Sequence, residues 1–209
     1  HLDLAISYHG MMNRDTFVSY VLNPRVDDEV LQKYRREIKN KFSRDEKQEL
    51  RNDPSQIWKL VEKAVVSRPE KERSSVITTP AGCLNTCTGS FLSKKILFVA
   101  MARTLGVPAR LNPHDRSMEY MENEKFVPVL AKTEKNSTLI LKSGEDTQWK
   151  YFQNWSIAKL ENGRYVSLKL GTEAFENQHM NLPLESGKYR ILTSNRLPNG
   201  NMFANEYHF

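Results

Sequence analysis

The sequence predicts an α+β protein, with a helical N-terminal half that ends in a core helix and strands, followed by a small antiparallel β-sandwich or barrel. Two observations support this prediction. Apolar residues recur at helical spacing in the first half of the chain, whereas from about residue 136 they alternate as in strands, with two Asn-Gly pairs between the runs. We expect two domains, residues 1–132 and 133–209, with the polar stretch Lys132–Asn136 at their boundary.

The composition excludes several classes of protein. Of the 209 residues, 39% are hydrophobic and 27% are charged, which is typical of a globular chain. The 31 Lys and Arg against 25 Asp and Glu leave a net charge of +6, without a basic patch that alternates with aromatic residues, so we expect no nucleic-acid partner. No apolar run is long enough to cross a membrane. Two cysteines exclude a disulfide scaffold, and the scattered histidines lack metal-ligand spacing, so we expect no metal and no other cofactor.

Two helices are expected before residue 70. The first begins at Asp27-Asp28-Glu29, whose acids suit a first helical turn, and its basic run, Arg35 to Lys41, is expected to form the solvated face. Its apolar residues recur at helical spacing: Val30, Leu31, Tyr34 and Ile38. The second helix begins after Asp53-Pro54, a capping residue followed by proline. Its predicted buried stripe is Ile57, Leu60, Val61 and Ala64.

A third helix is predicted from Ser90 to Leu105. It is apolar on nearly its whole circumference, which indicates a helix buried inside the domain. Gly106 ends it and Pro108 prevents it from resuming. The residues that follow, Val107–Arg110, are expected to lead into a strand.

The C-terminal part reads as strands and turns. A short apolar run, Thr138–Leu141, leads it. Asn162-Gly163 and Asn199-Gly200 each separate two β-like runs, and this pair of residues is the strongest short signal for a β-hairpin. We therefore predict two hairpins and a leading strand in this part.

The end of the third helix carries a more specific pattern. The stretch from Arg103 to Arg110, Arg-Thr-Leu-Gly-Val-Pro-Ala-Arg after an apolar helix, resembles the transglutaminase-like superfamily, whose fold is akin to that of papain. In that family a cysteine near the start of the helix is the nucleophile, and strands after the Pro-Ala-Arg exit carry the catalytic His and Asp. Three further segments look like large exported transglutaminase-like proteins of Bacteroidetes: Val21–Arg25, Phe152–Leu160 and Gly187–Gly200. The resemblance implies an exported protein, periplasmic or on the cell surface, of which this chain is one piece.

The chain departs from the family at all three catalytic positions. Phe91 stands at the nucleophile position, Met118 or Glu119 at the histidine position, and Pro128-Val129 where an aspartate is expected. One hypothesis is therefore a catalytically degenerate domain that binds glycan or peptide, or joins larger parts of the polypeptide. The alternative is an active cysteine peptidase or acyltransferase. Its residues would be a displaced nucleophile, Cys87 or Cys83, and a displaced base and orienting acid, His114 and Asp115.

Structural roles compete with these functional ones. Cys83 and Cys87 fit small buried packing residues or a redox pair, and His114-Asp115 fits a solvated turn. Arg103 is interpreted as a cation at a helix end and Arg110 as an ion-pair partner across a sheet. The aromatic residues of one C-terminal segment fit either a platform for a sugar or the domain core: Tyr151, Phe152 and Trp155.

Overall fold

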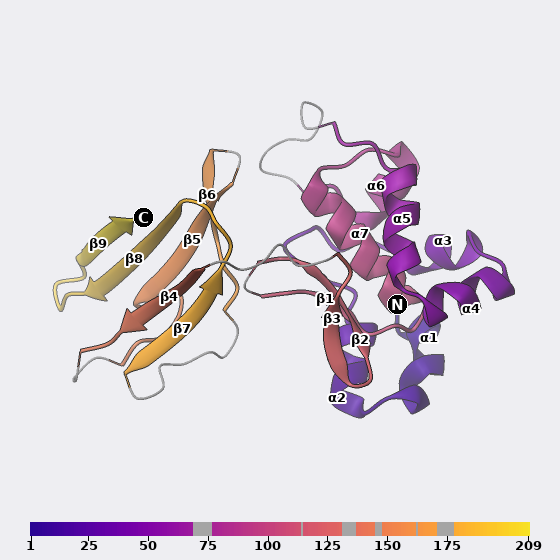
Figure 1. Ribbon diagram of the computed structural model, residues 1–209, viewed down its shortest axis with the longest axis horizontal. Coiled ribbons are helices and arrows are strands. Elements are labelled where there is room, and N and C mark those ends of the chain that lie inside the picture. Colours follow the sequence, from indigo (N-terminus) through magenta and orange to yellow (C-terminus); the bar gives the residue numbers. More distant parts are fainter. Residues whose placement is uncertain (69–76, 114, 131–136, 145–147, 162, 171–177) are drawn as a thin grey trace. The chain divides into compact units, whose positions relative to one another are not determined.

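The computed structural model describes residues 1–68, 77–113, 115–130, 137–144, 148–161, 163–170 and 178–209. The chain divides into two compact units, His1–Asn112 with Ser117–Ala131, and Pro113–Arg116 with Lys132–Phe209. The first, N-terminal unit combines helices with a three-stranded sheet, and the second, C-terminal unit is built from antiparallel strands (Figure 1). The α+β class is thus confirmed.

The N-terminal unit begins with short helices, and its longest described helix, α7, comes last before its sheet. The described helices are α1 (Leu2–Ala5), η1 (Ile6–Met11), α2 (Arg14–Phe17), η2 (Val18–Leu22), α3 (Arg35–Asn40), α4 (Arg44–Asn52), α5 (Ser55–Ala64), α6 (Pro80–Thr86) and α7 (Phe91–Thr104). Figure 1 shows α5 beside α7, and their side chains share one core. α5 follows Asp53-Pro54 as predicted, but Leu60 and Ala64 are exposed and Trp58 is buried in their place.

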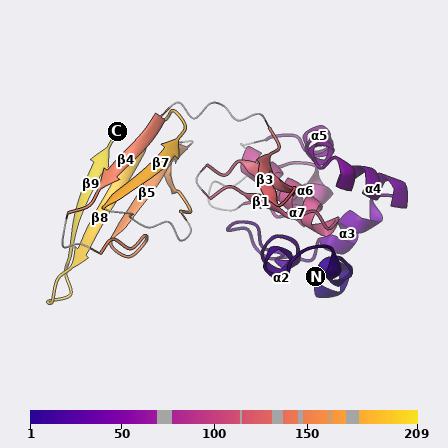
Figure 2. The ribbon, with the colours of Figure 1, turned by 60° about the horizontal axis from the view of Figure 1, so that its bottom comes forward.

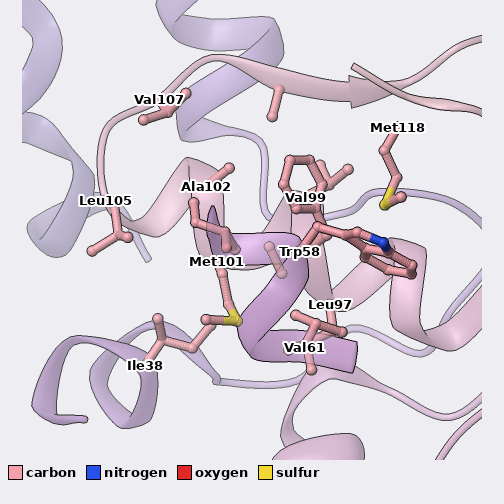
Figure 3. Close-up of a cluster of buried hydrophobic side chains, with 14 of the residues drawn as sticks. Ile38, Trp58, Val61, Leu97, Val99, Met101, Ala102, Leu105, Val107 and Met118 are labelled. Carbon is pink, nitrogen blue, oxygen red and sulfur yellow. The ribbon is translucent and has the colours of Figure 1, made fainter. Parts of the chain in front are cut away.

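α7 is the core of this unit, as its apolar circumference predicts. Its buried run extends from Ile96 to Thr104, and the surrounding cluster is drawn in Figure 3. Ser90 caps its start, where the Ser90 side chain accepts a hydrogen bond from the Ser93 backbone N–H. Gly106 follows its end with φ of +86°, the left-handed conformation that glycine adopts most readily.

The helix expected from Asp27 is wrong in its first half. Residues 23–34 form no helix, and α3 begins only at Arg35. The acidic residue Glu29 is buried, where it accepts hydrogen bonds from the backbone N–H groups of Val26 and Asp27 at 2.8 and 2.7 Å. A carboxylate that bonds backbone N–H groups this close in sequence stabilises a turn instead of a helix. Val30 and Leu31 are consequently exposed.

The sheet of the N-terminal unit follows α7 directly. It contains β1 (Ala109–Leu111), β2 (Met118–Glu122) and β3 (Lys125–Pro128), antiparallel and in that order. In the β1–β2 register Arg110 pairs with Glu119, and the two side chains form an ion pair of 2.9 Å, as predicted for Arg110. The Val107–Arg110 segment therefore leads into a strand, as expected.

The C-terminal unit contains two antiparallel sheets. The strands are β4 (Ser137–Lys142), β5 (Trp155–Glu161), β6 (Arg164–Ser167), β7 (His179–Leu184), β8 (Tyr189–Arg196) and β9 (Met202–His208). One sheet has the order β6-β5-β8-β9 (Figure 1), and β4 pairs with β7 in the other (Figure 2). Side chains of both sheets form one buried cluster. It includes Trp155, Ile157, Met180, Leu182 and Tyr189.

Both Asn-Gly pairs lie in hairpin turns, as predicted. Glu161 pairs with Arg164, and Gly163 between them has φ of +79°, as the predicted hairpin turn requires, whereas Asn162 lies outside the described residues. The second hairpin differs from the expected two-residue form. Leu197 and Asn201 are hydrogen bonded around a three-residue tip, and Gly200 supplies the left-handed residue at φ of +87°.

Candidate functional site

The start of α7 is the place where the resemblance expects a catalytic thiolate. Phe91 is the first residue of the helix, and its ring is 53% exposed. That ring lies edge-on to Trp58, with centroids 5.9 Å apart, and the Lys95 ammonium lies 4.9 Å from its centroid. The position therefore holds an aromatic ring that packs against its neighbours and carries no nucleophilic atom.

Cys83 lies close to this helix start but is inaccessible. It sits within α6, a short helix that begins at Pro80 behind the cap residue Thr79. A Cβ added to Gly89 would lie 2.9 Å from the Cys83 sulfur, which places the thiol against the backbone that enters α7. The side chain is 0% exposed, and its S–H points to the Thr78 carbonyl oxygen at 3.9 Å. The predicted packing role fits Cys83, because a substrate carbonyl cannot reach a fully covered sulfur.

Cys87 lies at the C-terminal end of α6. It is the C-terminal cap of that helix, in the left-handed conformation with φ of +52°. Its backbone N–H bonds the Cys83 carbonyl and its own carbonyl accepts from Val66. Cys87 is exposed and the two cysteines form no disulfide, so the prediction that both are buried packing residues is wrong for this one. The carbonyl end of a helix favours cations, so α6 offers no help to a thiolate there.

The proposed displaced base and acid are placed only in part. His114 lies outside the described residues. Asp115 belongs to the C-terminal unit, where it lines a small cavity with Lys159 and Tyr189, whereas both cysteines belong to the N-terminal unit. The cavity volume of about 10 Å³ has room for about one water molecule.

β2, where the resemblance expects the catalytic histidine, carries no histidine. Met118 is buried in the core around α7 (Figure 3). Glu119 is also buried, and its two carboxylate oxygens accept from Arg110 at 2.9 Å and from Asn112 at 2.8 Å. The Arg110 guanidinium in turn lies over the Phe126 ring. This carboxylate is held by a structural network and does not face a thiol.

Two buried arginines hold the N-terminal segment to the end of α7. Arg103 donates to the carbonyl oxygens of Ala109, Asn23 and Arg25 at 2.9, 2.9 and 2.8 Å. Burial lowers the pKa of Arg103 to about 10, so it remains charged at neutral pH. The interpretation of Arg103 as structural is thus supported, although its partners are backbone carbonyls of other segments.

Arg35 is the second buried arginine, and the expectation that it lies on a solvated face is wrong. Its guanidinium donates to the carbonyl oxygens of Val21, Leu22 and Arg103. These carbonyls lie at the ends of η2 and α7, where helices leave backbone oxygens without partners inside the helix. A guanidinium has enough donors to satisfy several of them, which explains why a cation is buried here.

The aromatic candidates of the C-terminal unit are mainly structural. Trp155 is buried, and the Tyr151 ring packs edge-on to it at 4.9 Å. The Tyr151 hydroxyl donates to the carbonyl oxygens of Ile157 and Leu168. Phe152 alone is exposed, at 63%. Trp155 and Tyr151 therefore fit the interpretation as core residues and not the interpretation as a platform for a sugar.

Sequence reasoning missed a groove on the β8–β9 hairpin of the same unit. It is lined by Trp149, Asn154, Thr193, Ser194, Asn195, Phe203 and Asn205, and its volume is about 280 Å³. The sequence signals the hairpin through Asn199-Gly200, but it does not give the register. The two-residue turn expected there would place Asn195 opposite Ala204, whereas the observed three-residue tip places it opposite Phe203.

No family model, curated protein or solved structure matches the chain. In the described ranges, no three His, Cys, Asp or Glu side chains are grouped as metal ligands. Of the described helices, none is both long and apolar enough to span a bilayer.

Proposed function

We propose that the chain is a transglutaminase-like domain of a larger exported protein, that it has lost cysteine-peptidase chemistry, and that it binds glycan or peptide. The order of elements supports the family part of this proposal. A buried helix, α7, is followed by the Gly-Val-Pro-Ala-Arg exit at residues 106–110 and then by an antiparallel three-stranded sheet. That is the order in which the family presents its catalytic helix and strands.

The observation that carries the loss of catalysis is the first turn of α7. A thiolate is stabilised at a helix N-terminus by the unpaired backbone N–H groups and the helix dipole. Here Ser90 already accepts from one of these N–H groups, and Phe91 fills the first helical position. A phenylalanine ring cannot attack an acyl carbon, so this site performs no acyl transfer.

One observation favours the alternative, an active peptidase or acyltransferase. The Cys83 sulfur packs against Gly89, at the entry to α7, so a shift of this entry would bring the thiol toward the helix start. The alternative therefore requires that the chain expose Cys83 in solution. It also requires a base for the thiol, for which the sequence offers His114.

Alkylation of the two thiols distinguishes these functions. We would measure labelling by iodoacetamide against pH, by mass spectrometry of the Cys87→Ser and Cys83→Ser variants. Only the thiolate reacts, so an ordinary thiol with a pKa of about 8.5 labels slowly at about pH 6. We expect Cys87, which is exposed, to label in the folded chain at a rate that the His114→Ala variant does not change. We expect Cys83 to label only after unfolding in urea, because its side chain is fully buried.

Rapid labelling of either thiol at about pH 6 would contradict the loss of catalysis if it disappears in a His114→Ala variant. His9→Ala is the matched control, because the His9 ring packs on Phe17 in the N-terminal helices. A parallel assay would measure cleavage of a casein substrate and transfer of a fluorescent amine to it. We expect neither activity above that of a variant that carries both Cys83→Ser and Cys87→Ser.

A further inference from the structure

The β8–β9 hairpin presents a groove whose described lining residues are all uncharged. Strand pairing places Thr193 opposite Asn205 and Asn195 opposite Phe203, so these four side chains lie on one face of the sheet. All residues of β9 are exposed, and Phe203 is 59% exposed. Among the residues that the structure describes, the lining has no Asp, Glu, Lys, Arg or His, although 27% of the chain is charged.

The polar side chains of this face are available to a ligand. Thr193, Asn195 and Asn205 make no side-chain hydrogen bond to the described residues. Each amide offers two N–H donors and one carbonyl acceptor, and a threonine hydroxyl can donate or accept. A ligand that fits them must therefore both donate and accept hydrogen bonds, and a charge on it would find no opposite charge among the described lining residues.

One wall of the groove is fixed in advance. The Asn154 side chain accepts from the Lys150 backbone N–H and donates to the Gln148 carbonyl, both at 2.8 Å. The Asn154 carbonyl accepts from the Ser194 backbone N–H at 2.8 Å, which attaches this loop to β8. Trp149, inside the loop, is thereby held at the groove, so little ordering has to accompany binding.

We propose that this groove binds a neutral oligosaccharide. Sugar rings combine hydroxyls, which both donate and accept, with C–H faces that pack on aromatic rings, and Phe203 and Trp149 supply such rings. The volume of about 280 Å³ admits about one or two sugar units. An acidic sugar or a phosphate ester would find no cation among the lining residues that the structure describes. This inference rests on the proposed function as a binding module and selects its ligand class and its site.

The test uses two-dimensional NMR of the ¹⁵N-labelled whole chain. The probes are neutral tetrasaccharides of β-glucose, α-glucose, xylose, mannose and N-acetylglucosamine, each titrated to about 10 mM, and tetragalacturonate as the anionic counterpart. We expect at least one neutral probe to shift the Trp149 indole and the Asn195 and Asn205 side-chain amides saturably. The Trp58 indole, buried in the N-terminal unit, should not move.

Variants locate the binding. Phe203→Ala and Asn205→Ala should each weaken binding about tenfold, the effect expected when one stacking or hydrogen-bonding partner is lost. Phe152→Ala is the matched control, because Phe152 is equally exposed in the same unit and does not line the groove. Light scattering on the same samples would show whether the chain is monomeric.

The inference is overturned if no neutral probe binds, if tetragalacturonate binds as well as the neutral probes, if Phe203→Ala binds unchanged, or if a dimer covers β9. Binding of an unstructured peptide to the groove, in place of every sugar, would overturn it too. None of these outcomes bears on the thiol experiment, which probes the N-terminal unit. A reactive thiol together with sugar binding would overturn the lost catalysis and leave this site in place.

Discussion

Substitution of Gly106 by alanine tests how α7 is packed against the N-terminal helices. Gly106 has φ of +86°, and an added Cβ would lie 2.5 to 2.7 Å from three ring carbons of Tyr8. These distances are too short for any real contact. The Tyr8 ring is buried against Phe17 and Val21, and the cations of Lys39 and Arg51 each lie 5.4 Å from its centroid. The ring therefore has little room to move.

Two costs add up in Gly106→Ala. A left-handed backbone costs an L-residue about 1 kcal/mol relative to glycine. Overpacking in a buried site costs about 1–3 kcal/mol more. We therefore expect the free energy of unfolding of the N-terminal unit to fall by about 2–4 kcal/mol, and its Tm by about 10 °C. Gly200→Ala separates the two costs, because Gly200 has φ of +87° but no atom within 4 Å of an added Cβ.

The assay must report on each unit separately. Fluorine NMR of fluorotryptophan-labelled protein, recorded against urea, follows Trp58 in the N-terminal unit and Trp155 in the C-terminal unit. In a double-mutant cycle, Tyr8→Ala should absorb the steric part of the Gly106→Ala effect, with a coupling of about 1–3 kcal/mol. The reasoning is refuted if Gly106→Ala destabilises its unit no more than Gly200→Ala destabilises the other.

Three further predictions concern burial, backbone and titration. Ala100→Asp should destabilise the N-terminal unit by more than about 3 kcal/mol, because Ala100 is fully buried in α7. Ala64→Asp, at an exposed position of α5, should lower the free energy of unfolding by less than about 1 kcal/mol in the same urea titration. Similar values for the two variants would contradict the buried placement of Ala100. Gly163→Val should lower the free energy of unfolding by more than about 1 kcal/mol, because valine is strained at the φ of +79° found there. Gly144→Val is the control, because Gly144 has no positive φ. Equal Tm values for the two variants would refute the turn assignment. Burial raises the pKa of Tyr151 to about 12, above the ordinary value of about 10. The stability that the protonated Tyr151 hydroxyl contributes is therefore complete below about pH 10 and is lost as the pH rises to about 12. The Tm of Tyr151→Phe should therefore fall less steeply with pH in that alkaline range. An unchanged slope of Tm against pH would contradict the raised pKa of Tyr151.

Local signals in the sequence predicted the elements that depend on local chemistry. α7 follows from its apolar circumference and its Ser90 and Gly106 boundaries, and the hairpins follow from their Asn-Gly pairs. β7 was not predicted, because Pro183 and the polar residues between its buried positions weaken the strand pattern.

Features that depend on distant partners could not be predicted in this way. Glu29 and Arg35 read as members of a helix, yet both are buried by partners that the helical pattern does not reveal. The site residues show the same limit. The burial of Cys83 depends on Gly89 and the entry to α7, and the groove on β8 and β9 depends on the loop that carries Trp149.

The two buried arginines have a consequence for the order in which the N-terminal unit forms. Arg103 bonds the Asn23 carbonyl, 80 residues earlier, and Arg35 bonds the Arg103 carbonyl, 68 residues later. Both guanidiniums lose water when the core closes, so each must meet its distant carbonyls in the same step. Closing chain loops of this length is entropically costly and slows folding. During synthesis, the first helices therefore cannot form a stable core until α7 has left the ribosome. We expect the unit to acquire its stability in one late, cooperative step.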